Sequence, residues 1–234
     1  MSVEKIRIMV ARAAGLLDIS KRVSSRHLPR VVTCVTLLSV CAATMRAQGA
    51  ELAIDLKADK KTIAQLRLRI KDDLATAAGP GVTERFDIKR MRWFDEKSLQ
   101  WVTLADSKKW ASRSKAQTKK SADSAAGHVR PFLLWSLEPS FKVDKSNGSL
   151  RLTSGQVDYV IEGEASKTNV DEFFRYAVLN AYKKAMTERK LAPFSELKAI
   201  AEMKSLRHIP RKISITMPGI PESPVIDMEI SEVN

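Results

Sequence analysis

A short uncharged stretch near the start of the chain constrains the fold more than any other feature. It runs from Val31 to Ala43 and follows a segment rich in Lys and Arg. A helix needs roughly 20 apolar residues to cross a bilayer, and this stretch is shorter. A basic segment, a short apolar stretch and then small residues are typical of a secretory signal peptide. We therefore expect a signal peptide region over 1–47 and a single exported domain over 48–234.

Two details of this region leave alternatives open. Met9 is a second candidate for the first residue, besides Met1, because it would shorten an unusually long basic segment. The run from Leu38 to Cys41 is similar to the lipobox of bacterial lipoproteins, in which the cysteine carries the lipid, although Val40 stands where a small residue is normal. The sequence predicts a periplasmic or extracellular protein, with a lipoprotein anchored at Cys41 as the alternative.

The cysteines and charges of the N-terminal region change what can be expected of the domain. Both cysteines of the chain, Cys34 and Cys41, lie in this region. A domain without cysteine has no disulfide, thiolate metal site or cysteine nucleophile. The region also contains eight of the 40 basic residues and two of the 27 acidic residues, so the domain keeps an excess of about seven positive charges. This excess favours anionic partners without indicating nucleic acid in particular.

Alternating apolar and polar residues predict several strands. We expect a hairpin over 85–104 with a polar turn at 95–98. A second hairpin over 141–153 turns at Asn147-Gly148, a pair suited to the positive φ angles of a tight turn, and a third strand over 157–162 extends it to a meander. Two further strands, over 212–217 and 225–230, are joined by a proline-rich turn.

Apolar residues at three- and four-residue spacing predict helices. The first is expected to begin at Asp59, with Ile63, Leu66, Ile70 and Leu74 on one side, and to end at 79–81. A strand is the alternative for this segment. Further helices are expected over 131–139, over 169–190 and from Pro193 onward. Together these elements predict an α+β fold, in which a curved antiparallel sheet of about six strands is covered on one face by three or four helices.

Residues 105–127 differ in composition from the rest of the domain. They are rich in Ala, Ser, Lys and Arg and have no sustained apolar period, so we expect an exposed basic loop. Its cations and its one large aromatic residue are candidates for anion binding, with the tryptophan stacking on a base or sugar: Lys108, Lys109, Trp110, Arg113, Lys115, Lys119 and Lys120. A solvated lysine-rich loop is the alternative interpretation.

No motif in the domain specifies a reaction. His128 and His208 are its only histidines, and zinc normally takes three or four His, Cys or carboxylate ligands, so we expect neither a metal nor a cofactor. A Ser-His arrangement lacks the Gly-x-Ser-x-Gly sequence that would select one serine. The candidate serines are Ser136, Ser154 and Ser195, and the candidate carboxylate pairs are Asp72-Asp73, Asp95-Glu96 and Glu162 with Glu164.

These absences favour a binding protein over an enzyme. The leading hypothesis is an exported, non-enzymatic domain of the cell envelope or the extracellular space that binds a partner protein, a hydrophobic ligand or an anionic polymer. A curved sheet filled by helices is the architecture of exported carriers of acyl chains or lipoproteins. The aromatic residues Phe173, Phe174, Tyr176 and Tyr182 would form the core or line such a pocket. The alternatives are a hydrolase that uses carboxylates or a Ser-His pair, and a polyanion-binding surface over 108–120.

Overall fold

The first and last strands of the domain pair with each other in the middle of one large sheet. In the computed structural model, which describes residues 49–125, 127, 129–146, 148–187, 193–220 and 222–233, eleven antiparallel strands follow the order β6-β5-β4-β3-β2-β1-β11-β10-β9-β8-β7. β1 (Ala50–Ala58) lies between β2 (Lys61–Lys71) and β11 (Ile226–Glu232). All other neighbours are consecutive in sequence. The sheet therefore consists of two meanders that meet at β1 and β11.

Each meander ends at an edge of the sheet. The N-terminal one continues through β3 (Leu74–Gly79), β4 (Val82–Asp87), β5 (Arg92–Asp95) and the edge strand β6 (Gln100–Thr103). The C-terminal one begins at the other edge with β7 (Lys142–Ser146) and continues through β8 (Ser149–Thr153), β9 (Asp158–Ser166) and β10 (Ile209–Thr216). The chain must therefore pass from one edge to the other between β6 and β7.

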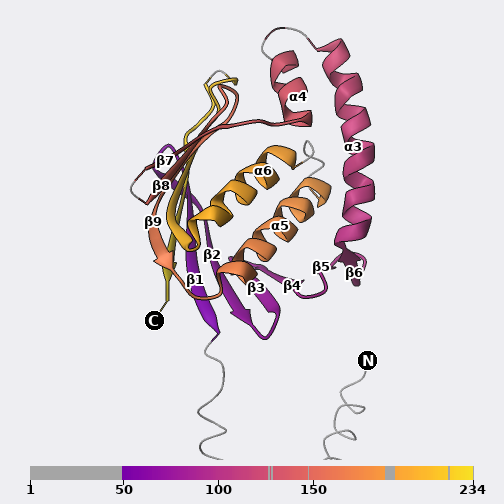
Figure 1. Cartoon of the computed structure of the whole chain (residues 1–234). Helices are drawn as coiled ribbons and strands as arrows, with labels where there is room; N and C mark the ends of the chain where they lie inside the picture. The colour runs from indigo at the N-terminus through magenta and orange to yellow at the C-terminus, as the bar shows by residue number, and fades with distance from the viewer. Residues whose placement is uncertain are drawn as a thin grey trace, which may run out of the picture. The chain divides into compact units, whose positions relative to one another are not determined.

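Two pairs of helices connect these strands. The passage from β6 to β7 contains α3 (Leu104–Ser124) and α4 (Val129–Leu137), while α5 (Val170–Thr187), α6 (Phe194–Met203) and the short helix η1 (Lys204–Leu206) lie between β9 and β10. In Figure 1, α5 and α6 lie side by side against one face of the sheet, and α3 runs along the far side of α5. None of the helices in the described part of the chain is long and apolar enough to cross a membrane.

The predicted sheet of about six strands covered by helices is wrong. The described chain is mostly sheet, with eleven strands and four α-helices. The strand over 50–58 was missed although its residues alternate, with Leu52 and Ile54 buried and Glu51 and Asp55 on the opposite face. Residues 85–93, expected as one strand, are divided between β4 and β5 by a turn at 88–91. Both differences add strands to the sheet.

The helix predicted from Asp59 onward is also wrong, because this segment forms β2 and β3. Ile63 and Leu74, which would lie on the apolar side of that helix, are 60% and 41% exposed. Leu68 and Ile70, which alternate with arginines, are 0% and 2% exposed. A period of two therefore describes the burial, as the alternative prediction of a strand requires. The sequence at 79–81, expected to end a helix, forms the turn from β3 to β4.

The exposed loop predicted over 105–127 is the third correction, because Leu104–Ser124 forms α3. The Thr103 side chain accepts a hydrogen bond from the backbone N–H of Asp106 and caps the helix. Its buried residues are small or hydroxylated, namely Ser107, Ala111, Thr118 and Ala122. Small and hydroxylated residues do not form a recognisable apolar stripe in a sequence, and the helical period of this segment was therefore missed.

The remaining elements agree with the sequence. The hairpin over 141–153 is confirmed as β7 and β8, with Gly148 at a φ of 80° in its turn, and it continues into β9. The helices expected over 131–139, over 169–190 and after Pro193 are confirmed as α4, α5 and α6, and the two C-terminal strands as β10 and β11. The signal peptide region, Asn147 and His128 lie outside the described residues.

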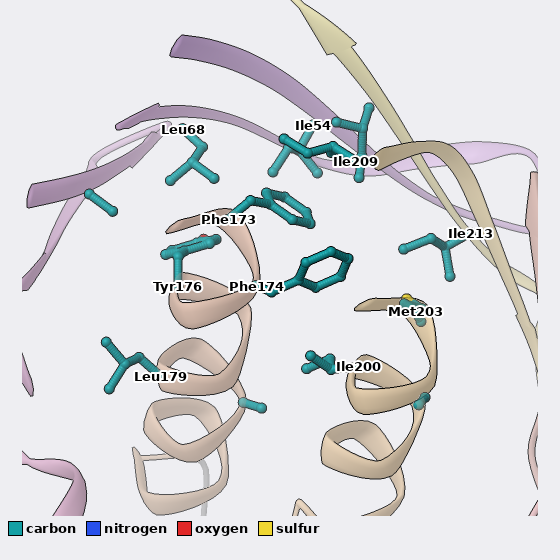
Figure 2. Packing of buried hydrophobic residues seen from close by; sticks show 14 of the residues in the cluster. Ile54, Leu68, Phe173, Phe174, Tyr176, Leu179, Ile200, Met203, Ile209 and Ile213 are labelled. Atoms are coloured by element: carbon teal, nitrogen blue, oxygen red, sulfur yellow. The ribbon is translucent and has the colours of Figure 1, made fainter. Parts of the chain in front are cut away.

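Aromatic and aliphatic side chains fill the space between the sheet and its helices. Figure 2 shows Phe173 and Tyr176 of α5 close to Ile54 and Leu68 of the sheet, and Phe174 between α5 and α6. Beside them, Ile200 and Met203 of α6 complete the same cluster. The four aromatic residues expected in the core or a pocket are at most 8% exposed, which confirms that they belong to the core.

Asp87, at the end of β4, is the charged residue that is most deeply buried among those described, at 8% exposure. Burial raises the pKa of Asp87, but hydrogen bonds from the backbone and side chain of Arg90 and from Arg92 outweigh it and hold this pKa below its ordinary value. The carboxylate therefore ties the turn at 88–91 to β4 and β5 in its charged form.

We predict that Asp87→Asn lowers the free energy of unfolding by about 1–3 kcal/mol at neutral pH, because charge-assisted hydrogen bonds are lost. A lowered pKa in the folded state stabilises the fold above the unfolded pKa of about 4, and this stabilisation is lost as the pH falls through the folded value. The difference between wild type and variant in urea unfolding should therefore shrink in acid. Asp123→Asn, at an exposed site of α3, serves as the control and should change stability little.

Candidate functional site

A small group of polar residues interrupts the apolar interior between the sheet and helices α5 and α6. Glu84 lies on β4 two residues before buried Phe86 and therefore on the same face of the strand. Its carboxylate accepts a hydrogen bond from Lys183 of α5 and forms an ion pair with it. The Lys183 side chain is 15% exposed and its ammonium lies 5.7 Å from the centre of the Phe86 ring. The ion pair therefore lies beside the aromatic ring of Phe86.

One buried tyrosine, Tyr176, lies near Glu84, and a second, Tyr159, lies near Ser195 and Glu196 of α6. Burial raises the pKa of Tyr176, and the nearby carboxylates of Glu84 and Glu196 raise it further. Burial likewise raises the pKa of Tyr159, to which Glu196 adds, while a hydrogen bond with Ser195 acts in the opposite direction. Both phenols therefore stay neutral at physiological pH. We call Glu84, Tyr159, Tyr176 and Lys183 the interior polar cluster; Glu196 is exposed and lies outside it.

Aromatic rings lead from this cluster towards α4. Tyr159 contacts Phe141 edge to face, with ring centres 5.6 Å apart, and Phe141 contacts Trp135 of α4 in the same way at 5.7 Å. Trp135 in turn lies 6.2 Å from Phe132. Aromatic residues of this kind offer large apolar contact areas to a ligand as well as to one another. The interior thus combines a long apolar wall with a few polar groups, which is the composition of most small-molecule sites.

Helix α3 lies alongside α5 and is attached through small side chains. Its fully buried residues include two alanines, while Leu104 and Trp110 are only partly buried against the core. The hydroxyls of Ser107 and Thr118 donate to carbonyls of α3 itself, at 2.7 and 2.9 Å, and not to the rest of the domain. Full burial of one Leu or Phe stabilises a fold by about 1.5–3 kcal/mol, and α3 contributes no residue of that size in full. We infer that α3 is weakly attached to the rest of the domain.

Four hollows of the described surface lie away from the interior polar cluster. One of about 500 Å³ opens over the outer face of β1, β2 and β3, lined by Asp55, Gln65 and Arg67 among others. Others, of about 330, 390 and 420 Å³, lie at the start of α5, at the ends of β8 and β9, and beside Asp73 and Asp87. None of these hollows is lined by a member of the interior polar cluster. The interior is packed with the protein's own side chains, so a ligand could enter only if a helix moved.

The predicted catalytic serines are engaged in local structure. The hydroxyl of Ser136 donates to the carbonyl of Leu133 within α4, and that of Ser154 donates to the carbonyl of Val157 in the turn before β9. Ser195 begins α6 and bonds to Tyr159. Among the described residues no serine hydrogen-bonds to His208, whose Nε2 is buried without a partner. His128 lies outside the described residues.

The predicted carboxylate pairs are distributed over turns and strand edges. Asp73 forms an ion pair with Lys89, Glu96 with Arg85 and Glu164 with Lys167. Hydrogen bonds from Ser98 and from the backbone of Lys97 lower the pKa of Asp95, which closes the turn between β5 and β6. Within the described part of the chain, no three His, Cys, Asp or Glu side chains converge to hold a metal ion.

The predicted anion-binding residues lie on α3 and differ in exposure: five of the cations are exposed, whereas Lys115 and Trp110 are half-buried. Lys108, Lys109, Arg113, Lys119 and Lys120 are exposed, and none forms an ion pair with another described residue. Lys115, by contrast, is half-buried and pairs with Glu138 at 3.2 Å. Trp110 is half-buried against the core, so it is not presented beside the exposed cations to stack on a base.

Comparisons with known proteins add no identification. No family model matches the chain, and no curated protein is similar to it in sequence.

Glu84 and Lys183 were missed by sequence reasoning, because each is a lone charge within an alternating strand or an amphipathic helix. The one available signal was the position of Lys183 beside buried Tyr182 and Ala185.

The weak attachment of α3 can be tested with single cysteines. In a chain carrying Cys34→Ser and Cys41→Ser, Ala122→Cys on α3 and Ala199→Cys on α6 would each place a thiol at a site that is 0% exposed. We predict that the thiol at 122 reacts with an aromatic disulfide reagent at least about tenfold faster, because local opening exposes it without unfolding the sheet. Equal rates in two variants of matched stability would show that α3 opens only with the whole domain.

Proposed function

We propose that this protein is an exported, non-enzymatic binding domain that takes up an amphipathic ligand with an acyl chain between its sheet and its helices. The observation that carries this proposal is the interior polar cluster within an aromatic interior, next to a helix held by small side chains. The apolar walls would accept the chain, and Lys183 with the two tyrosines would meet the polar head. Displacement of α3 would open a path for the ligand from solvent to the space between the sheet and the helices.

The chemistry of the cluster favours binding over catalysis. Both tyrosine pKa values are raised, so neither phenol supplies a base at neutral pH. The Lys183 ammonium donates a hydrogen bond to the Glu84 carboxylate. A charged ammonium and neutral phenols donate hydrogen bonds, which suits the recognition of a carboxylate, phosphate or carbonyl head group.

We predict that the full chain binds a dansylated fatty acid and that saturated fatty acids displace this probe. The affinity of the chain for the saturated fatty acids should rise with their length. Each methylene that leaves water contributes up to about 0.8 kcal/mol, or roughly fourfold in affinity. Titrations with acids of eight, ten and twelve carbons should therefore give dissociation constants that fall several-fold at each step. Affinity that is independent of chain length would contradict an interior acyl site.

The head-group contact requires a separate comparison. We predict that Lys183→Met weakens the binding of a fatty acid by about tenfold, whereas the matching fatty alcohol is affected less, because only the carboxylate gains a charge-assisted bond. Lys184→Met is the control, since its ammonium is in no ion pair with another described residue. Equal losses in the two lysine variants would exclude Lys183 as the head-group contact.

A further inference from the structure

The outer surface of α3 carries a band of cations along the whole helix. The buried face of α3 includes Ala111 and Thr118. Two residues along a helix correspond to about 200° of rotation. The cations two residues away from a buried residue therefore lie on the opposite face, namely Lys109, Arg113 and Lys120. Lys108 and Lys119 lie beside this band. The acids of the helix, Asp106 and Asp123, stand near its two ends. A helix of 21 residues is about 30 Å long, so the band presents a linear array of positive charge.

Exposed apolar residues adjoin the band where α3 and α4 meet. Val129 and Leu134 of α4 are 43% and 45% exposed, and Arg130 between them is exposed as well. α3 and α4 are in contact, and in Figure 1 the end at which they are joined lies away from the strands. The last turns of α3, which carry Lys119 and Lys120, and the start of α4, which carries Val129 and Arg130, therefore lie at the same end of the hairpin. Cations and apolar side chains share one end of the hairpin.

We propose that the α3–α4 hairpin docks on the surface of an anionic lipid membrane. Cations next to exposed aliphatic side chains match the interface of a bilayer, where head groups carry negative charge and the acyl boundary accepts apolar groups. A nucleic acid or another soluble polyanion would use the same cations but would gain nothing from Val129 and Leu134, and Trp110 is turned into the core. This inference depends on the outer surface alone and is independent of what the interior binds.

A probe at the hairpin isolates this contact from other membrane contacts. The full chain contains the apolar stretch Val31–Ala43, which we expect to bind lipid, so total binding to vesicles is not diagnostic. In the chain carrying Cys34→Ser and Cys41→Ser, an environment-sensitive nitrobenzoxadiazole dye is attached at Val129→Cys or, as a control, at Val82→Cys. Val82 is 56% exposed and lies at the turn between β3 and β4, in a different part of the sheet.

The expected result is a blue shift of the dye at 129 with vesicles of phosphatidylglycerol and phosphatidylcholine, and none with phosphatidylcholine alone. The dye at 82 should not respond. Replacement of Lys108, Lys109, Arg113, Lys119 and Lys120 by Gln should raise the lipid concentration at half-response by more than about tenfold, since each cation contributes near an anionic surface. Glutamine keeps the helix propensity of lysine.

A matched variant separates the position of the cations from their number. It carries Gln at five other exposed lysines that form no ion pair with a described residue, namely Lys60, Lys61, Lys71, Lys142 and Lys145, and should behave like the parent. The proposal is overturned if both five-fold variants lose the response equally, or if neutral vesicles give the same shift at 129. It is also overturned if heparin binds to the α3 cations while the dye at 129 ignores anionic vesicles.

Discussion

The pairing of β1 with β11 is the interaction on which the rest of the domain depends. Seven residue pairs join the two strands, from Leu52 with Glu232 to Ala58 with Ile226. Backbone bonds extend the pairing past both ends, from Asp59 N–H to the carbonyl of Val225 at 3.0 Å and from Val233 N–H to that of Glu51 at 2.8 Å. Without it the two meanders would be separate sheets, and the continuous surface against which α5 and α6 pack would be divided. Contacts so distant in sequence close slowly during folding.

This central pairing leaves β6 and β7 as the two edges, which determines where α3 and α4 can lie. The chain leaves the sheet at one edge and returns at the other, so the segment between them has to bridge the helices that fill the interior. β7 is exposed over its whole length and carries Lys142 and Lys145, charges that discourage pairing with another chain. Charged side chains thus protect the edge strand β7. The connection between the two edges, formed by α3 and α4, buries few large side chains. Weak attachment of α3 follows from its place in the topology as well as from its composition.

The sequence was informative wherever one period was unambiguous. The hairpin around Gly148, helices α5 and α6 and the last two strands were predicted because each combines a clear period with a turn or cap signal. β2 was misassigned because Ile63, Leu66, Ile70 and Leu74 also fit a helix, and only pairing with β1 and β3 decides between the periods. α3 was missed because it faces the domain with alanine, serine and threonine. The interior polar cluster could not be foreseen, since β4 and α5 are more than 80 residues apart in sequence and only the fold unites them.

Stability alone does not explain the Lys183–Glu84 pair. The pair is only partly buried, with the Lys183 side chain 15% exposed and the Glu84 side chain 31% exposed, and ion pairs that keep contact with water contribute little to stability. β4 and α5 otherwise follow their patterns, with Phe86, Phe174 and Leu179 among the most buried residues of the domain. Two charged residues therefore meet at a place where apolar side chains would also serve the core, and sequences depart from their local pattern chiefly at functional or strained sites. The departure involves α5, which is in contact with the weakly attached helix α3. A core built for rigidity alone would require neither feature, whereas the proposed uptake of a ligand with a polar head would use both.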